Sequence, residues 1–307
     1  MAILICAPDR DNQPLADDLA AHLPGVDIRL WPELGQARDI DFAVLWKHPP
    51  GLVASLPNLK AISSLGAGIE HLILDDSIPP SMPVGRLAGP KLAQDMATWL
   101  VGHVIADWRD FARFQHQQQR HEWAPWAPHR PARVGILGMG HMGRTTADAL
   151  NVLGFEVLGW RHQGGEIDGV TVHRGEDGLM AMAADADYLI CLLPLTPATR
   201  GILNAKLMAT MPRHSVLINV GRGAHLIEED LIEALDQGHL RRAIVDVFET
   251  EPLPEDHAFW SHQSITVSPH CAALTRPEEA AELLAQSYVR VQANKTPLGL
   301  VDLSQGY

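Results

Sequence analysis

A glycine-rich turn between a short strand and a helix is the feature that most constrains the fold of this chain. The apolar segment Arg133–Leu137 predicts a strand, and the pattern Gly-x-Gly-x-x-Gly follows it at Gly138, Gly140 and Gly143. A helical pattern comes next, and Glu156–Trp160 predicts a second strand. In such a unit the first glycine permits a tight turn, the second lets the backbone approach a pyrophosphate, and the third lets the helix pack close to the strand. The sequence therefore predicts a dinucleotide-binding unit.

The start of that helix is the expected pyrophosphate site. Its first N–H groups have no partner within the helix, and the helix dipole favours an anion there. We therefore expect the whole turn to contact the cofactor, and its residues are Gly138, Met139, Gly140, His141, Met142 and Gly143.

The end of the second strand bears on the choice between NAD(H) and NADP(H). An NAD-selective site carries Asp or Glu here, to accept a hydrogen bond from the ribose 2′-OH. In this chain Trp160 is followed by Arg161 and His162, and a guanidinium matches a 2′-phosphate through two parallel hydrogen bonds. We expect these three residues to lie beside the cofactor and NADP(H) to be preferred, with NAD(H) possible. The alternative, that Arg161 is an ordinary solvated residue, stays open.

Length, charge and cysteine content narrow the class of protein. The 307 residues are enough for about two domains. A net charge of −13 argues against nucleic acid or an acidic membrane surface as a partner. No apolar run is long enough to span a bilayer, and the apolar Ala2–Cys6 lacks the basic region of a signal peptide. Three widely separated cysteines argue against disulfides and fit a reducing cytoplasm.

Metal binding is not expected. His116, His121 and His129 lie near Glu122, but their spacing matches no compact set of metal ligands. The chain also carries 16 histidines, so a few close together need no special explanation.

Short strands that alternate with helices predict parallel sheets. We expect strands at residues 2–6, 26–31, 42–46, 61–64, 84–87, 133–137, 156–160, 170–173, 187–193, 216–220, 243–247 and 265–267. The fold class is α/β, with two doubly wound parallel-sheet domains. Residues 1–98 and 277–307 would form a flavodoxin-like domain, and residues 99–276 a Rossmann domain.

Two helices are predicted where the two domains join along the chain. Residues 91–119 show one long helical pattern with an unusually aromatic apolar stripe, which is either core or partly a subunit interface. A last helix is expected to begin with a capping box at Thr275 and Glu278, to continue to about Ala293, and to return to the first domain.

Three polar residues follow buried strands of the second domain. Arg222 lies between two glycines, Glu251 follows the next strand, and His270 follows a third. The carboxyl ends of parallel strands meet at one edge, so these side chains are expected to converge beside the nicotinamide. An arginine can hold a carboxylate and polarise a carbonyl, and a histidine oriented by a carboxylate can exchange a proton. Taken singly, each has an ordinary alternative as a turn or solvated loop residue.

These segments together resemble the D-isomer-specific 2-hydroxyacid dehydrogenases over nearly the whole chain. The matching segments are Gly138–Gly143, Leu193–Pro197, Asn219–Gly223, Asp246–Phe248, Glu251–Pro254 and Pro269–His270. Within that family the likeness is strongest to enzymes that reduce glyoxylate and hydroxypyruvate. It rests there on Leu45–Pro50, Leu65–Gly68, Thr275–Glu278 and Gly306–Tyr307. One departure concerns the cofactor: those enzymes have a Ser and a longer basic run after the strand-end Trp, where this chain has Arg161-His162-Gln163.

The resemblance implies a role for each matching residue. His270 would be the acid/base, paired with Glu251, and Arg222 would bind the 2-oxo acid. The implied substrate-binding residues are Trp46, Leu65, Gly66, Ala67, Gly68, Arg222 and His270. Besides the glycine turn and the strand-end residues, the implied cofactor-binding residues are Leu193, Pro194, Thr199, Val220, Gly221, Arg222, Asp246, His270 and Ala272. Asp246 would meet the nicotinamide carboxamide, and packing alone is the alternative for Trp46.

The implied activity is reduction of glyoxylate to glycolate and of hydroxypyruvate to D-glycerate with NADPH. The family also implies a homodimer through the second domain, which fits the aromatic stripe. A 2-hydroxyacid dehydrogenase for a bulkier 2-oxo acid such as phenylpyruvate stays open, because the pocket width is not set by these motifs. A non-catalytic dinucleotide-sensing scaffold is a further alternative, since such proteins on this fold keep the Arg–Glu–His set.

Overall fold

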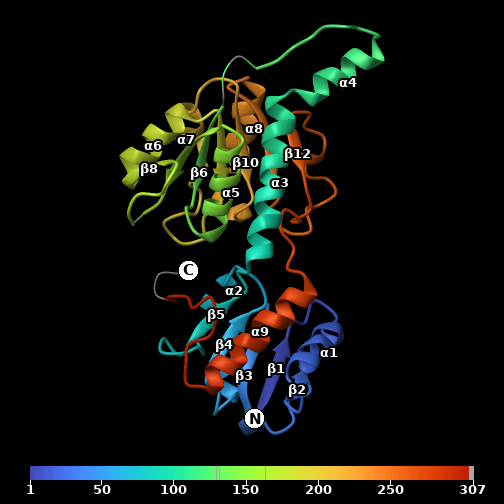
Figure 1. Ribbon diagram of the computed structural model, residues 1–307, viewed down its shortest axis with the longest axis vertical. Helices are drawn as coiled ribbons and strands as arrows, with labels where there is room; N and C mark the ends of the chain where they lie inside the picture. The colour runs from blue at the N-terminus through green and yellow to red at the C-terminus, as the bar shows by residue number, and fades with distance from the viewer. Residues whose placement is uncertain (129, 131, 163, 304–307) are drawn as a thin grey trace. The chain divides into compact units, whose positions relative to one another are not determined.

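The computed structural model describes residues 1–128, 130, 132–162 and 164–303. The chain divides into two compact units (Figure 1): Met1–Leu92 with Thr275–Tyr307, and Ala93–Leu274. Each unit contains its own parallel sheet, so the predicted class of two doubly wound α/β domains is confirmed. The expected domain limits after residues 98 and 276 stay a prediction. His129, Gln163 and Gly306–Tyr307, which entered the predictions above, lie outside the described residues.

The sheet of the first unit has five parallel strands in the order β2-β1-β3-β4-β5. This is the flavodoxin-like order, which reverses direction beside the first strand. The strands are β1 (Ala2–Cys6), β2 (Asp27–Leu30), β3 (Ile40–Leu45), β4 (Ala61–Ser64) and β5 (Val84–Arg86). Strands β1, β3 and β4 are buried along their whole length, which explains the continuous apolar sequence of β1.

Helices cover both faces of this sheet. Helices α1 (Gln13–His22) and α9 (Pro277–Gln292) pack on one face, where Phe42 and Tyr288 meet edge to face with centroids 5.9 Å apart. Short helices cover the other face, and they are α2 (Glu70–Ile73), η1 (Ala37–Asp39) and η2 (Val53–Ser55). The last helix therefore belongs to the first unit, as predicted.

The second unit has seven parallel strands in the order β12-β11-β10-β9-β6-β7-β8. The strands are β6 (Arg133–Leu137), β7 (Glu156–Trp160), β8 (Val170–His173), β9 (Tyr188–Cys191), β10 (Ser215–Asn219), β11 (Leu240–Val245) and β12 (Ile265–Val267). Counted within the unit, this is the Rossmann order 3-2-1-4-5-6 with a seventh strand added. The order reverses between β6 and β9, so the predicted ligand-binding crevice lies at the carboxyl ends of these two strands.

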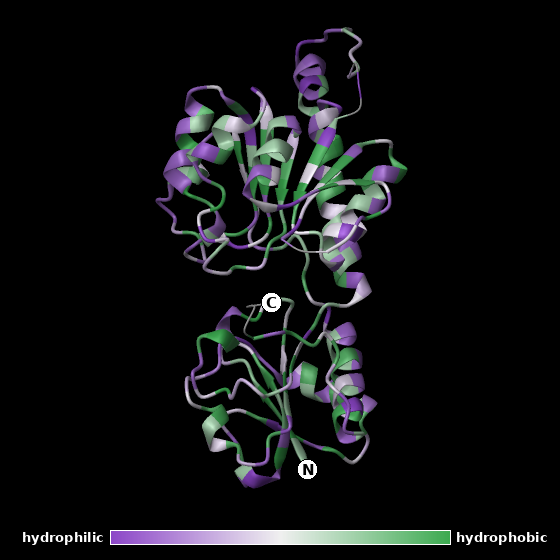
Figure 2. Ribbon diagram, turned by 90° about the vertical axis from the view of Figure 1, so that its left-hand side faces the viewer, coloured by the Kyte–Doolittle hydropathy of each residue, from purple (hydrophilic) through white to green (hydrophobic). Residues whose placement is uncertain are grey.

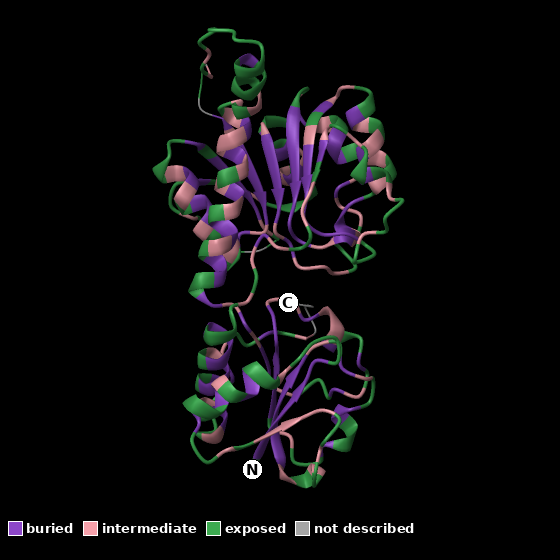
Figure 3. Cartoon of the chain, turned by 90° about the vertical axis from the view of Figure 1, so that its right-hand side faces the viewer, coloured by how far each residue is buried: buried purple, intermediate pink, exposed green. Residues whose placement is uncertain are grey.

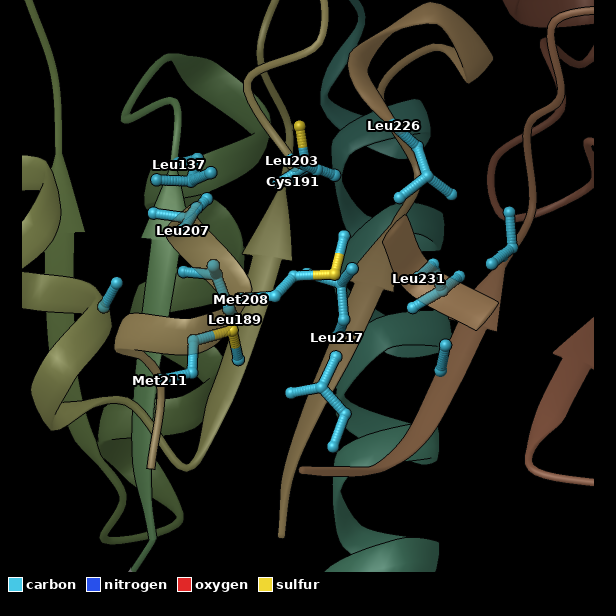
Figure 4. Packing of buried hydrophobic residues seen from close by; sticks show 14 of the residues in the cluster. Leu137, Leu189, Cys191, Leu203, Leu207, Met208, Met211, Leu217, Leu226 and Leu231 are labelled. Carbon is cyan, nitrogen blue, oxygen red and sulfur yellow. The ribbon is translucent and has the colours of Figure 1, made fainter. Parts of the chain in front are cut away.

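Two apolar layers enclose the second sheet. Helices α3 (Pro90–Trp108) and α5 (His141–Val152) pack on one face. Helices α6 (Gly175–Asp185), α7 (Ala205–Thr210) and α8 (Glu228–Asp236) pack on the other. Figure 4 shows Met208 of α7 lying over Leu189 of β9 and Leu217 of β10. The short helices η3 (Gly223–His225) and η4 (Ala258–Trp260) follow β10 and β11.

The distribution of apolar residues follows this layering in each unit. The strands are mostly hydrophobic and the helices carry polar outer faces (Figure 2). The same strands are buried, whereas the outer helix faces are exposed (Figure 3). No helix in the described part of the chain is both long and apolar enough to cross a membrane.

The prediction of one long helix over residues 91–119 is wrong, because two helices occupy this segment. Helix α3 ends at Trp108 and α4 (Phe111–Gln119) begins after Asp110. Asp110 has a left-handed backbone with φ +51°, and its carboxylate accepts from the Arg113 N–H. A residue in that conformation interrupts a helix, while its side chain caps the next one.

The apolar stripe divides at this break. Met96, Leu100 and Val104 of α3 are buried in the core of the second unit. Phe111 and Phe114 of α4 are exposed instead. The apolar stripe thus consists of core residues in α3 and of aromatic residues in α4 that are exposed on the surface of the single chain.

The predicted capping box at the start of the last helix is also wrong. Arg276 is the residue that precedes α9, it is extended, and no side chain caps the helix there. Pro277 opens the first turn and needs no hydrogen-bond partner, because it has no N–H. Glu279 in that turn reaches the Lys91 N–H at 3.2 Å instead.

Candidate active site

The glycine turn after β6 lies against the segment that follows β9. Gly138 has φ +101°, and a Cβ there would lie 2.7 Å from the Leu192 carbonyl oxygen. A Cβ on Gly143 would overlap the carbonyl oxygen of Gly138, so only glycine lets α5 start this close to the turn. The two backbones therefore meet at the point where the strand order reverses.

The amino end of α5 is open at that point. Gly140 precedes the helix with no side chain capping it, and a Cβ there would meet no atom within 4 Å. The N–H groups of His141 and Met142 donate to no described residue. Free donors, an open glycine and the positive end of a helix fit a pyrophosphate, so the residues present fit a dinucleotide.

The predicted cofactor residues differ in what their side chains can offer. Those of Met139, Trp160, Leu193, Val220 and Ala272 are buried. The Trp160 indole N–H also donates to the Gly175 carbonyl oxygen at 2.8 Å. Apolar packing or main-chain contacts are therefore what these positions can give a cofactor, whereas Arg161 is only half-buried and His162 is exposed.

Thr199 holds the loop that follows β9. Its hydroxyl donates to the Pro194 carbonyl oxygen at 2.7 Å and accepts from the Thr196 N–H at 2.8 Å. These bonds fold the loop from Pro194 to Thr199 back on itself at the carboxyl edge of the sheet. Gly221 lies beside this loop, since a Cβ there would be 3.2 Å from the Leu193 carbonyl oxygen.

His270 and Glu251 form a hydrogen-bonded pair, as the sequence predicted. His270 Nδ1 lies 2.8 Å from Glu251 Oε2, and the other oxygen, Oε1, accepts from the Phe248 N–H at 3.0 Å. The carboxylate is thereby fixed by the backbone at one oxygen and orients the imidazole with the other. This arrangement leaves His270 Nε2 as the nitrogen that can exchange a proton with a ligand.

The surroundings keep Glu251 ionised. Burial raises the pKa of Glu251, but hydrogen bonds from His270 and the Phe248 N–H, with the charges of His270 and Arg222, outweigh it. The pKa of Glu251 is therefore lowered from its ordinary value. A carboxylate that stays charged can stabilise a protonated imidazole beside it.

Asp246 fixes the loop that carries His270. Its Oδ1 accepts from the Ser268 hydroxyl at 2.6 Å and from the Cys271 N–H at 2.9 Å, and Oδ2 accepts from the Ala272 N–H at 3.0 Å. The Asp246 carbonyl oxygen also accepts from the His270 N–H at 2.8 Å. His270 has φ +50°, which is uncommon for a residue with a side chain, so these bonds hold it in a strained conformation.

Arg222 follows β10, close to the loop that carries Glu251. A Cβ on Gly223 would overlap the peptide between Phe248 and Glu249, so the two loops touch through their backbones. Arg222 Nη1 donates to the Gly221 carbonyl oxygen at 2.7 Å, and the Arg222 charge contributes to the lowered pKa of Glu251. The structure thus brings Arg222, Glu251 and His270 together at one edge of the second sheet.

The sequence reasoning missed His225, which positions Arg222. This histidine is fully buried, its Nδ1 accepts from the Arg222 N–H at 2.9 Å, and its Nε2 lies 3.2 Å from the Pro194 carbonyl oxygen. These two bonds require the proton on Nε2. His225 therefore joins the loop after β10 to the loop after β9, and its place three residues after Arg222 was the available signal.

The predicted substrate residues of the first unit gather after β3 and β4. Trp46 lies over Gly66, where a Cβ would be 2.8 Å from the indole ring. The His71 ring packs against the indole at a tilt of 56°, with the ring centroids 4.7 Å apart, and the Arg10 guanidinium lies 5.5 Å from the indole centroid. Trp46 is thus held in one place by its neighbours, and a larger residue at position 66 would displace it.

The main chain beside Trp46 offers two hydrogen-bond donors. The N–H of Leu65 already donates to the Leu45 carbonyl oxygen at 3.1 Å. Ser64 Oγ donates to the Gly68 carbonyl oxygen at 2.7 Å and lies 3.4 Å from the Gly66 N–H. The N–H groups of Ala67 and Gly68 donate to no described residue. Those two are therefore the donors best placed to receive an anion.

A buried histidine–carboxylate pair, His48 with Asp75, lies in the first unit and was not predicted. His48 Nε2 is 2.8 Å from Asp75 Oδ2, and Asp75 also accepts from the N–H groups of Ser77 and Gly51. The pair ties the segment after Trp46 to the one after α2. Nowhere in the described ranges do His, Cys, Asp or Glu side chains form a group of three that could hold a metal ion.

Fold and site together define a dinucleotide-binding enzyme with an arginine and an oriented acid/base pair at the carboxyl edge of its Rossmann sheet. Residues 101–272 match the model of the D-isomer-specific 2-hydroxyacid dehydrogenases, NAD-binding domain. The chain belongs to this family and is an NAD(P)-dependent oxidoreductase.

Individual relatives resemble the chain over its full length. It is 38% identical to a glyoxylate/hydroxypyruvate reductase A of Serratia proteamaculans and 36% identical to that of Yersinia enterocolitica, with 100% of each chain covered. A 2-hydroxyacid dehydrogenase of Xanthobacter autotrophicus in complex with NADPH is 35% identical with a TM-score of 0.92, covering 100% of this chain and 99% of that one. An NADPH-dependent glyoxylate/hydroxypyruvate reductase of Sinorhizobium meliloti, solved with NADP, is 32% identical with a TM-score of 0.90 and 100% of both chains covered.

Proposed function

We propose that the protein reduces glyoxylate to glycolate and hydroxypyruvate to D-glycerate, with NADPH preferred over NADH. The observation that carries this proposal is the His270–Glu251 pair, 2.8 Å apart, with Arg222 beside it and the open glycine turn in the same unit. The glyoxylate/hydroxypyruvate reductases among its relatives support the substrate class. The relatives solved with NADPH or NADP support the cofactor preference.

NADPH would supply the hydride, and the protein would supply position, charge and a proton. Arg222 would hold the 2-oxo acid and polarise its carbonyl oxygen through charged hydrogen bonds. His270, kept in one orientation by Glu251, would give its Nε2 proton to that oxygen as it becomes a hydroxyl. Asp246 would contact the nicotinamide carboxamide with the acceptor capacity that its three donors leave.

The substrate's carboxylate would take its own set of donors. The N–H groups of Ala67 and Gly68 donate to no described residue, and they would bind the carboxylate. Trp46, which lies close to His71 and Arg10, would limit the space for the group attached to the carbonyl. A small group such as hydrogen or hydroxymethyl would be accepted more readily than a benzyl group.

Initial rates with four 2-oxo acids and two cofactors test this proposal. We expect glyoxylate and hydroxypyruvate to be reduced faster than pyruvate or phenylpyruvate, and each faster with NADPH than with NADH. Turnover of phenylpyruvate alone would be consistent with the family, but it would contradict the proposed role of Trp46. Equal rates with both cofactors would contradict the preference, and no turnover at all would favour a dinucleotide sensor.

Two further properties belong to the same proposal. We infer that the protein is a homodimer in which the segment of residues 111–128 lies at the interface, because Phe111, Phe114 and Trp123 are exposed on it. We also infer that it works in the cytoplasm, since Cys6, Cys191 and Cys271 are all free thiols. Cell fractionation against a periplasmic marker tests the second inference.

A further inference from the structure

Two arginines follow neighbouring strands at the predicted 2′-phosphate site. Strands β7 and β8 are parallel, with Trp160 paired to His173 at their ends. The next residues are therefore neighbours: Arg161 follows β7, and Arg174 follows β8. The Arg161 N–H donates to the His173 carbonyl oxygen at 3.2 Å, which fixes the two chain ends against each other.

Both guanidinium groups lie against Gly164. Arg174 Nε donates to the Gly164 carbonyl oxygen at 2.9 Å. A Cβ on Gly164 would overlap the Arg161 guanidinium. Arg161 therefore fills the space that a side chain at position 164 would need. Gly164 also has φ +111°, a conformation that residues with a side chain rarely adopt. The loop thus brings two permanent positive charges to one residue.

The two charges are weakly opposed by the described residues around them. The Arg161 side chain makes no hydrogen bond or ion pair with any of these residues. Arg174 has one acidic neighbour, Glu166, at 3.4 Å, and the Glu166 side chain is 83% exposed. Such an exposed pair contributes little and can exchange for a better anion. Glu176, two positions after Arg174, is paired with Lys206 at 2.9 Å.

We propose that Arg174 is a second ligand of the NADP(H) 2′-phosphate and, with Arg161, determines the preference for NADPH. The proposal rests on the proposed function, and it assigns a residue that the strand-end motif does not contain. The basic residues directly after Trp160 are few, and Arg174 supplies from the neighbouring strand a second charge that does not titrate. A 2′-phosphate carries two negative charges near neutral pH, so two guanidinium groups match it in charge and in hydrogen bonding.

Steady-state kinetics of Arg174→Ser test the proposal, with Arg161→Ser as the reference. We expect Arg174→Ser to raise the KM for NADPH by about tenfold or more, the loss expected for a charged hydrogen bond. The KM for NADH should change far less, since NADH lacks the phosphate. The matched control is Arg213→Ser, an exposed arginine that also donates to a glycine carbonyl, at 3.4 Å from Gly238, just before the amino end of β10.

Direct binding separates the contact from catalysis. Calorimetry with 2′,5′-ADP and with 5′-AMP as probes should show that Arg174→Ser weakens the first and spares the second. Gly164→Ala should act in the same direction, because its Cβ displaces the Arg161 guanidinium. If the wild type prefers NADPH while Arg174→Ser affects both cofactors or both probes equally, the role of Arg174 is refuted alone. If the wild type itself shows no preference for NADPH, the proposed function fails first.

Discussion

At the scale of single residues, the carboxylates of the site serve different purposes that follow from their partners. Glu251 gives one oxygen to the backbone and the other to His270, so it can stabilise the protonated imidazole before the proton is given away. Asp246 accepts three hydrogen bonds from the loop that carries His270. The first carboxylate orients the imidazole of His270, and the second fixes the backbone of the loop that carries it.

Asp246→Asn should damage both stability and turnover. The amide NH₂ group of asparagine would face a donor at one of the two oxygen positions, leaving at least one hydrogen bond unmade. We expect the free energy of unfolding to fall by about 1–3 kcal/mol, the usual loss for a buried donor without an acceptor. Because His270 would lose its fixed loop, kcat should fall as well. Urea unfolding and initial rates measure the two effects, and unchanged values of both would contradict the role of Asp246 in fixing the loop that carries His270.

Asp75 should make the stability of the protein depend on pH in the acid range. Burial raises its pKa, but hydrogen bonds from Ser77, His48 and Gly51 outweigh burial and lower the pKa of Asp75 from 3.8 to about 2. The stabilisation is therefore fully present above the unfolded value and is lost as the pH falls toward the folded value.

Comparison of the wild type with Asp75→Asn isolates that contribution. Between about pH 6 and about pH 3, the wild type should lose about 1 kcal/mol more unfolding free energy than the variant. Urea titrations at several pH values give this difference. A constant difference across the range would mean that Asp75 keeps its ordinary pKa in the folded protein.

At the scale of elements, the site depends on backbones that approach closely where strands end. Gly223 lets the loop after β10 touch the peptide between Phe248 and Glu249 in the loop after β11. Gly138 and Gly143 do the same for the turn after β6. Small residues at strand ends thus set the distances among the larger side chains that are proposed to carry the chemistry.

Gly223→Ala should separate Arg222 from Glu251. The new Cβ would overlap a backbone peptide, which cannot move aside as a flexible side chain can. We expect a loss of about 1–3 kcal/mol of stability from overpacking and a lower kcat/KM for the 2-oxo acid. Cofactor affinity should change less, because α5 is not involved. The control is Gly102→Ala, where a Cβ would meet no atom within 4 Å.

The elements that the sequence predicted well are those with unambiguous patterns. Continuous apolar strands such as Ala2–Cys6 are found with the expected bounds because they are buried on both faces. The interruption at Asp110 was missed because the apolar spacing continues through it, although the aspartate itself adopts a left-handed conformation. The prediction of a capping box failed because the spacing of a threonine and a glutamate does not reveal which residue directly precedes the helix. In this chain that residue is Arg276, which is extended.

For the site, the sequence supplied the residues but not their local partners. Arg222, Glu251 and His270 could be predicted to meet, because carboxyl ends of parallel strands share an edge. The contact of His225 with Pro194 could not, since it depends on how two loops fold. The same holds for the Asp75–His48 pair, whose members are 27 positions apart.

At the scale of the whole molecule, the predicted dimer depends on the exposed aromatic side chains of the segment 111–128, which we expect at the interface. Trp123 is 96% exposed, and Phe111 and Phe114 lie on the short helix α4. We expect sedimentation equilibrium to give twice the chain mass. Phe114→Ser combined with Trp123→Ser should weaken the association, whereas Val289→Ser, a similarly exposed apolar residue of α9, should not. A wild type that sediments as a monomer would contradict the proposed interface.

The central claim is that His270 gives the proton while NADPH reduces a 2-oxo acid, and single-turnover oxidation of bound NADPH by glyoxylate tests it most directly. Enzyme saturated with NADPH would be mixed with glyoxylate, for the wild type and for His270→Gln, after cofactor affinity has been measured for each. We expect the variant to bind NADPH with nearly the wild-type affinity and to oxidise it at least about a hundredfold more slowly, the usual contribution of a general acid. Oxidation at the wild-type rate, or loss of NADPH binding in place of slow chemistry, would contradict the account.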